Sequence, residues 1–159
     1  MRVYLAAPFG EPESVKRQIA EAAREAIQKR RQEIEVYAPW EYKVPHAYEY
    51  PNHEWGLMVY TNDVYALDHA DWVVVLSYGR TDTTVGTAWE AGYAFASGKY
   101  VLVVEVDGDL PRNDGEVAEP EIQSIMMANG CFARIRGLKA LKDFDFQNPK
   151  PYRTMTEQK

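Results

Sequence analysis

One glutamate is a candidate for chemistry because of the residues that surround it. Glu90 lies in the segment GTAWEAGYA, residues 86–94, whose small residues let a ligand approach the backbone, while Trp89 and Tyr93 offer flat apolar surface. A ring-shaped substrate would suit this segment. We expect Glu90 in the first turn of a helix, where unpaired N–H groups favour an ionised, nucleophilic carboxylate. The alternative for Glu90 is an acid that only complements the helix dipole. The alternative for the segment 86–94 is core packing against a sheet.

The sequence lacks the common motifs for phosphates and metals. No GxGxxG follows a strand, no GxxxxGK[ST] is present, and no spacing of Cys and His suits zinc, so a dinucleotide site, a P-loop and a metal site lack support. His46, His53 and His69 are scattered along the chain. We interpret each of them as a surface or structural residue.

Composition favours a folded, acidic protein. The chain has 159 residues, of which 46% are hydrophobic, and this size predicts one domain over residues 1–159. The net charge of −6 disfavours nucleic-acid polymers as partners, although backbone N–H groups can still bind one phosphate. A lone cysteine, Cys131, indicates a cytoplasmic protein. No apolar run is long enough for a signal peptide or a membrane span, so we expect no membrane partner.

The elements that must position Glu90 follow from the apolar pattern. Strands are expected at residues 2–7, 34–38, 72–76, 100–106 and 131–135. Helices are expected from the acidic segment around Pro12, then at 53–69, 86–97 with Gly98 as its stop, 120–128 and 138–144. This alternation predicts an α/β fold, a parallel five-stranded sheet with helices on both faces.

In such folds ligands bind beyond the carboxyl ends of the strands. We therefore expect the chemistry in four loops or segments. They are the turn after the first strand, which contains Pro8 and Phe9, the aromatic loop 40–51, the loop 79–86, and the segment around Ser124.

Beyond these patterns, the chain resembles the nucleoside 2-deoxyribosyltransferases. The segments RVYLAAPF, YTND at 60–63, HADWVVVL, GTAWEAGYA, GKYVLVV and LKDFDF occur in the order seen in that family, over nearly the whole chain. The resemblance is weakest at 107–119 and at the final residues. It implies a flavodoxin-like (Rossmann-like) fold and no cofactor. It also implies that Glu90 attacks C1′ of a 2′-deoxynucleoside, a nucleobase departs, and a second base resolves the deoxyribosyl-glutamate intermediate.

The resemblance implies roles for two further side chains. Tyr4 matches a first-strand tyrosine whose hydroxyl orients the nucleophile; a buried strand aromatic is the alternative. Asp63 matches an acid that contacts the leaving base, and a partly protonated carboxyl there would supply the proton that the base needs. Without the resemblance, Asp63 would be a solvated helix acid.

Other positions match or depart from the family and concern substrate binding. Gly86, Trp89, Pro8 and Phe9 are expected to line the substrate. Thr84 stands where the family has an aspartate six residues before the nucleophile, with Asp82 as a possible substitute. Lys43 stands near a glutamine of the base pocket, with a solvated loop lysine as the alternative.

Ser124 occupies the position of an asparagine that reaches across a subunit interface toward the sugar 5′-hydroxyl. This implies a homo-oligomer with sites shared between subunits. With a serine at this position, the chain resembles related nucleotide hydrolases. Hydrolysis of 2′-deoxynucleoside 5′-monophosphates is therefore the second hypothesis. The alternative for Ser124 is a helix serine that binds no ligand. A non-catalytic nucleotide-binding module is the third hypothesis. The chain ends in MTEQK where transferases often end in tyrosine, but LKDFDFQNPKPY resembles the transferases.

Overall fold

The structure is a computed structural model, and it describes residues 1–8, 14–30, 33–78, 84–106 and 125–151. Within these ranges five parallel strands form one sheet in the order β2-β1-β3-β4-β5. The strands are β1 (Arg2–Ala6), β2 (Glu35–Tyr37), β3 (Trp72–Ser77), β4 (Tyr100–Glu105) and β5 (Ala133–Arg136).

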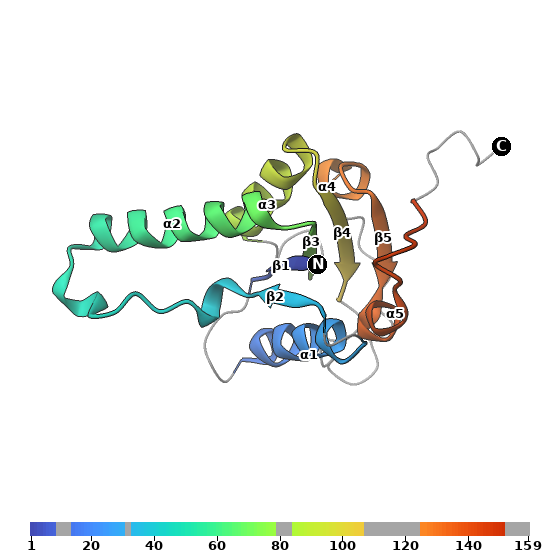
Figure 1. The fold of residues 1–159 in the computed structure, drawn as a ribbon, viewed down its shortest axis with the longest axis horizontal. Helices are drawn as coiled ribbons and strands as arrows, with labels where there is room; N and C mark the ends of the chain where they lie inside the picture. Colours follow the sequence, from blue (N-terminus) through green and yellow to red (C-terminus); the bar gives the residue numbers. More distant parts are fainter. Residues whose placement is uncertain (9–13, 31–32, 79–83, 107–124, 152–159) are drawn as a thin grey trace, which may run out of the picture.

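Helices cover both faces of the sheet (Figure 1). They are α1 (Val15–Arg30), α2 (Asn52–His69), α3 (Val85–Ala96), α4 (Ile125–Asn129) and α5 (Gly137–Asp143), with single 3-10 turns η1 (Pro39–Glu41) and η2 (Ala47–Glu49). The helices α1 and α5 pack on one face, and α2, α3 and α4 pack on the other. The predicted fold class, a five-stranded parallel α/β sheet with helices on both faces, is confirmed.

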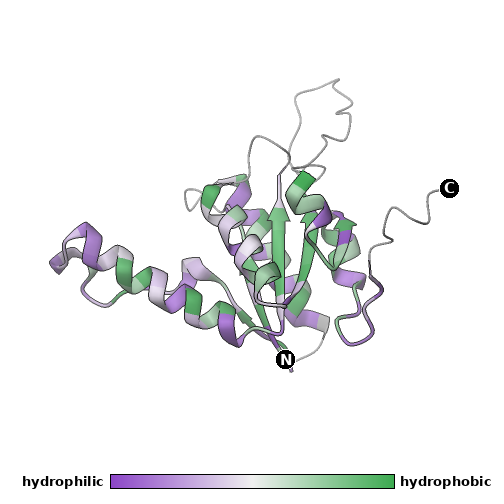
Figure 2. Ribbon diagram, turned by 90° about the horizontal axis from the view of Figure 1, so that it is seen from above, coloured by the Kyte–Doolittle hydropathy of each residue, from purple (hydrophilic) through white to green (hydrophobic). Residues whose placement is uncertain are grey.

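Alternation along the strands builds a core on each face of the sheet. Val3 and Leu5 of β1 pack toward α1 and α5, whereas Tyr4 and Ala6 pack toward α2 and α3. All six residues of β3 are buried, as expected for a strand covered on both faces. Figure 2 shows these apolar strands at the centre of the molecule. The side chain of Tyr4 is thereby fixed on the face that α2 and α3 cover.

Local capping sets the ends of the helices. The helix α1 begins at Val15, where Ser14 Oγ accepts a hydrogen bond from Arg17 N (3.2 Å), while Pro12 lies outside the described residues. The helix α3 ends before Gly98, which has φ of 71° and closes the helix with a bond from its N–H to Phe95 O (3.1 Å). The predicted stop at Gly98 is confirmed.

The C-terminal elements begin later than the sequence predicts, or outside what is described. The strand β5 starts at Ala133 rather than Cys131, because Cys131 lies in the bend after α4, where its Sγ donates to Ala128 O (3.5 Å). The helix expected at 120–128 is described only as α4, which ends at Asn129.

The first half of α2 projects from the body of the molecule together with η2 (Figure 1). Its residues are largely exposed, as shown by Leu57 at 64%, and Tyr48 of η2 is 85% exposed. Trp40 of η1 is buried in the core with α1 and holds the base of this projection. No helix among the described residues combines the length and the apolar character needed to cross a membrane.

Candidate functional site

A tyrosine of β1 and a glutamate of α3 form the centre of the site. Tyr4 is fully buried, and its hydroxyl donates a hydrogen bond of 2.6 Å to Glu90 Oε1. Glu90 is half-buried on the side of α3 that faces the sheet. The two residues are 86 positions apart in sequence and meet because β1 lies beside β3, the strand that leads into α3. A hydrogen bond of this length to a carboxylate fixes which way that carboxylate points.

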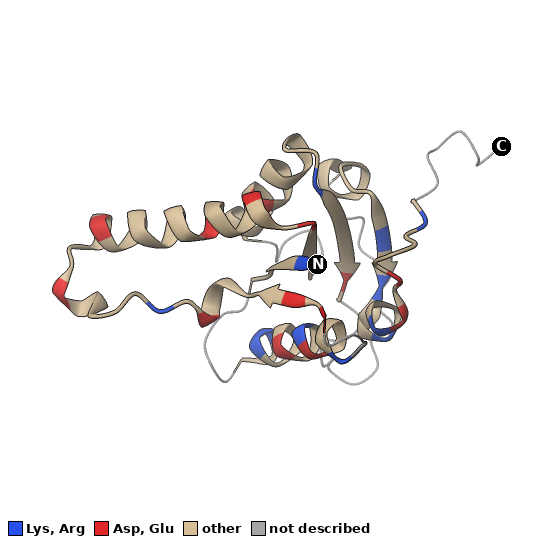
Figure 3. Cartoon of the chain, viewed as in Figure 1, with Lys and Arg blue, Asp and Glu red and all other residues tan. Residues whose placement is uncertain are grey.

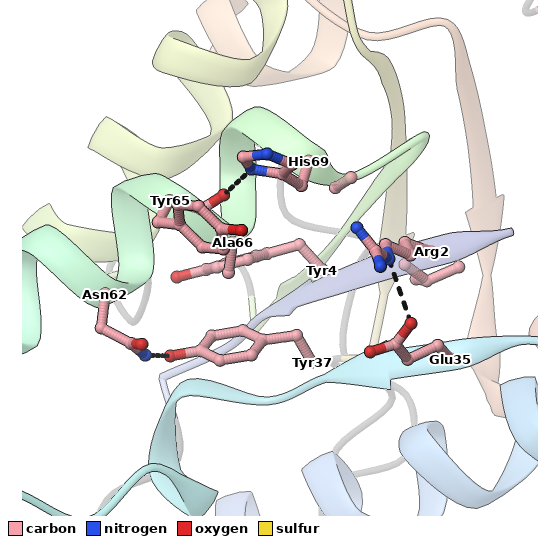
Figure 4. A pocket seen from close by; sticks show the side chains of 10 residues that line it. Arg2, Tyr4, Glu35, Tyr37, Asn62, Tyr65, Ala66 and His69 are labelled. Carbon is pink, nitrogen blue, oxygen red and sulfur yellow. Dashed lines mark hydrogen bonds and ion pairs between the residues drawn. The ribbon is translucent and has the colours of Figure 1, made fainter.

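A second carboxyl group of the site is held in a similar way. The hydroxyl of Tyr37, the last residue of β2, donates to Asp63 Oδ1 on α2 at 2.7 Å, and the amide of Asn62 donates to the Tyr37 hydroxyl. Tyr37 pairs with Tyr4 across β1 and β2, and their rings stack with centroids 5.3 Å apart. Figure 4 shows the two rings one above the other, with Asn62 bonded to Tyr37.

Burial sets the protonation of these groups. Burial raises the pKa of Glu90 to about 7; the hydrogen bond from Tyr4 lowers it and the charge of Asp63 raises it. Burial also raises the pKa of Asp63, against the hydrogen bond from Tyr37, which lowers it. The pKa values of Tyr4 and Tyr37 are raised far above their usual range, chiefly by burial, so both phenols remain donors. Near neutral pH a substantial fraction of Glu90 is therefore ionised.

The two carboxyl groups line one cavity between α2 and α3, with a volume of about 380 Å³. Trp89 and Tyr60 form its aromatic walls, with ring centroids 5.9 Å apart. The other lining residues are Val64, Leu67, Val85 and Gly86. The cavity is large enough for a small ring compound, and it brings flat apolar surface next to two carboxyl groups.

The position of Glu90 corrects one expectation. The helix α3 begins at Val85, so Glu90 lies in its second turn, and the unpaired N–H groups of the first turn cannot favour its ionised form. The environment raises the pKa of Glu90 instead. Tyr4, Asp63 and Glu90 lie on a strand and two helices that cover the same face of the sheet, and the expectation that the chemistry lies in the loops stays a prediction.

The structure brings some of the expected substrate residues to the cavity and leaves others away from it. Gly86 and Trp89 line it. Thr84 caps α3 by accepting a hydrogen bond from Thr87 N at 3.3 Å. Lys43 is exposed in the loop after η1 and does not line the cavity, and Pro8 is buried just beyond β1. Phe9, Asp82 and Ser124 lie outside the described residues.

Two residues of the site could not be recognised from the sequence pattern. Tyr37 ends a short strand, and only its register with Tyr4 brings it to Asp63. Asn62 stands in the segment YTND beside Asp63, and its contact with Tyr37 becomes visible only in the fold.

The histidines lie apart from the cavity. His69 Nδ1 lies 2.8 Å from Tyr65 O at the end of α2, and His46 lies 3.3 Å from Glu49 in the projecting loop. His53 is exposed at the start of α2. The described residues contain no group of His, Cys, Asp and Glu side chains that could hold a metal ion.

Comparison with known proteins shows which family the chain is similar to. The family model for nucleoside 2-deoxyribosyltransferase matches residues 3–138. A nucleoside deoxyribosyltransferase of Lactobacillus leichmannii is 29% identical over 96 residues, which are 60% of this chain and 54% of that protein. The chain thus spans about half the length of this curated relative in the match.

Solved structures show the same fold over almost the full chain. The 2-deoxyribosyltransferase from Bacillus psychrosaccharolyticus superposes with a TM-score of 0.70 at 25% identity, covering 96% of this chain and 100% of that one. A conserved protein from Enterococcus faecalis V583 superposes with a TM-score of 0.67 at 19% identity, covering 90% and 95% of the two chains. Because the family model spans most of the sequence, the chain belongs to the nucleoside 2-deoxyribosyltransferase family.

Proposed function

We propose that the protein exchanges the nucleobase of 2′-deoxyribonucleosides through a covalent deoxyribosyl-glutamate intermediate. The observation that carries this proposal is the hydrogen bond of 2.6 Å between Tyr4 and Glu90 at the wall of an aromatic cavity. Membership of the family and the similarity to the Bacillus psychrosaccharolyticus 2-deoxyribosyltransferase support the reaction class.

In the first step a carboxylate oxygen of Glu90 forms a bond to C1′ as the bond from C1′ to the base nitrogen breaks. The bonding electrons leave with the base, which takes up a proton. Tyr4 donates to Oε1, so it holds the carboxylate in one orientation and leaves Oε2 as the oxygen that attacks. The transition state carries positive charge on the sugar, which the negative charge of the Glu90 carboxylate stabilises.

Asp63 supplies the proton to the departing base in this proposal. Its carboxyl lines the same cavity as Glu90, and burial raises its pKa, which increases the fraction that carries a proton. In the second step a nitrogen of another base attacks C1′, the ester bond to Glu90 breaks, and the incoming base returns a proton to Asp63. The protein ends the cycle unchanged, without a cofactor.

The charge of the described residues around the cavity supports a neutral deoxynucleoside as the substrate. Figure 3 shows α2 with acidic residues and no Lys or Arg. The described residues that line the cavity include two carboxyl groups and no cation to pair with a phosphate. The hypothesis of a 5′-monophosphate hydrolase rests on Ser124, which the described residues do not include.

Two incubations test the activity. With a deoxynucleoside and a different free base, we expect a new deoxynucleoside to form. With a deoxynucleoside 5′-monophosphate alone, we expect no release of base. Formation of only free base and sugar phosphate would instead show a hydrolase, and no reaction in either tube would favour a binding module.

Trapping tests the role of Glu90. A 2-fluoro arabinosyl nucleoside, whose fluorine slows both steps, should add its sugar mass to a peptide that contains Glu90. The variant Glu90→Gln should acquire no such mass, whereas Glu54→Gln, an exposed acid at the start of α2, should be labelled like the wild type. An active wild type that carries no adduct contradicts the covalent mechanism.

We also propose that the protein assembles as a homo-oligomer in the cytoplasm. Apolar side chains on α3 and α4 support the assembly: Phe95, Ile125 and Met126 are 60%, 73% and 81% exposed and line a hollow of about 500 Å³. Sedimentation at micromolar concentration should give a mass above one chain. A monomeric mass would contradict active sites shared between subunits. It would not contradict the proposed reaction at Glu90.

A further inference from the structure

We propose that Tyr37 is a positioning residue for the reaction, and that it holds Asp63, with Asn62 fixing the direction of the Tyr37 hydroxyl. The inference rests on the proposed function, in which Asp63 meets the leaving base. Its evidence is independent of that function, because it comes from the contacts on the side of Asp63 that faces β2.

The hydrogen bonds in this cluster have a defined direction. The amide of Asn62 is a donor, so the oxygen of Tyr37 accepts from it and turns its own O–H toward Asp63 Oδ1, 2.7 Å away. Among the described residues Asp63 Oδ2 has no hydrogen-bond partner, while the carboxyl group itself lines the cavity. The cluster therefore fixes one oxygen and leaves the other to exchange a proton with the base.

The sheet holds Tyr37 in place. Its ring stacks on the Tyr4 ring at an interplanar angle of 27°, and the two residues are register partners in β1 and β2. Both tyrosines also line a separate cavity of about 250 Å³ with Asn62 and Tyr65 (Figure 4). One stacked pair thus serves both carboxyl groups, with Tyr4 donating to Glu90 and Tyr37 to Asp63.

The first test is kinetic. Tyr37→Phe keeps the stacked ring and removes the donor, so kcat/KM for base exchange should fall about tenfold or more with little change in KM. In an Asp63→Asn background the same change should alter kcat/KM less than about twofold, because Tyr37 acts only through Asp63. Equal losses in both backgrounds would overturn the inference. Tyr65→Phe is the matched control, because Tyr65 lines the cavity of about 250 Å³ together with Tyr37. This variant should behave as the wild type.

A second variant covers the case in which Tyr37→Phe folds poorly. Asn62→Ala keeps the tyrosine and releases its hydroxyl to rotate, so kcat/KM should fall about threefold or more, again only when Asp63 is present. A wild-type rate in Asn62→Ala would contradict the assigned direction of the hydroxyl.

The third test needs no activity. The titratable groups that face Asp63 are Tyr37 from β2, Tyr4 from β1 and Glu90 from α3. In carbon-13 NMR titrations of labelled aspartate, with the Asp63 signal assigned by its loss in Asp63→Asn, Tyr37→Phe should move the Asp63 midpoint up by about one pH unit. An unmoved midpoint would overturn this inference alone. A wild type without glycosyl chemistry would overturn the proposed function, and the titration would still report the contact.

Discussion

Removing the hydroxyl of Tyr4 should move the acid limb of the pH profile to higher pH. Tyr4→Phe keeps the buried ring and removes the donor that lies 2.6 Å from Glu90 Oε1. This donor lowers the pKa of Glu90, against burial, and the balance lies at about 7. A hydrogen bond to a charged group contributes about 1.5–3 kcal/mol, which corresponds to about one to two pH units. The pKa of Glu90 in the variant should then lie between about 8 and 9.

The sign follows from the state that attacks. Only the carboxylate is nucleophilic, so kcat/KM falls as pH drops below the pKa of Glu90 in the unliganded enzyme. With a wild-type pKa of about 7, about a tenth of Glu90 is ionised at about pH 6. In Tyr4→Phe that fraction falls by about a further ten- to hundredfold. Near about pH 9.5 the two profiles should converge, apart from any loss of orientation.

The assay is the release of base from a deoxynucleoside at subsaturating concentration, with a second free base as acceptor, across about pH 5–10. Tyr78→Phe is a matched control, because Tyr78 is buried on the other face of the sheet, and its hydroxyl donates to Lys16 O at 3.0 Å. Its acid limb should coincide with that of the wild type. An acid limb of Tyr4→Phe at or below the wild-type pH would refute the reasoning.

Two further predictions concern stability and binding. The pKa of Glu90 in the fold is about 7 against an ordinary 4.5, so its stabilising contribution is complete below about pH 4.5 and is lost as pH rises through about 7. Glu90→Gln should therefore raise the free energy of unfolding at about pH 8 by about 1–3 kcal/mol more than at about pH 5, as measured by urea unfolding; equal effects at both pH values would count against it. Trp89→Ala removes an aromatic wall of the cavity and should raise KM about tenfold with kcat little changed. Trp55→Ala, which removes a tryptophan of similar exposure (44% against 45%), should leave KM unchanged, and similar effects of the two variants would contradict the role of the wall.

The elements of the fold could be predicted because their signals are local. The apolar run of β3 is buried over its whole length, and Leu67, which follows the helical spacing, is fully buried at the end of α2. Tyr4 and Glu90 could be predicted as partners only through the resemblance, because 86 residues separate them. Their contact confirms that the two side chains meet, while their roles stay predictions.

The boundaries and some of the site could not be predicted, for physical reasons. The cap at Thr84 starts α3 at Val85, one residue before the expected start, so Glu90 is the sixth residue of the helix and lies in its second turn. The resemblance predicts a substrate role for Thr84 from the position of the family's aspartate, and the sequence pattern does not show that its hydroxyl caps α3. Tyr37 has no local pattern at all, since its partners Tyr4 and Asp63 come from other elements.

The sheet order makes the two carboxyl groups unequal in how firmly they are anchored. Tyr4 belongs to a strand with neighbours on both sides, whereas Tyr37 closes a three-residue strand at the margin of the sheet. Edge strands of a sheet open locally at a lower free-energy cost than central strands. On mild warming, the hydrogen bond from Tyr37 to Asp63 should break while the hydrogen bond from Tyr4 to Glu90 persists. The protein would then still capture sugars from compounds whose leaving groups depart without assistance, after it has ceased to process ordinary deoxynucleosides.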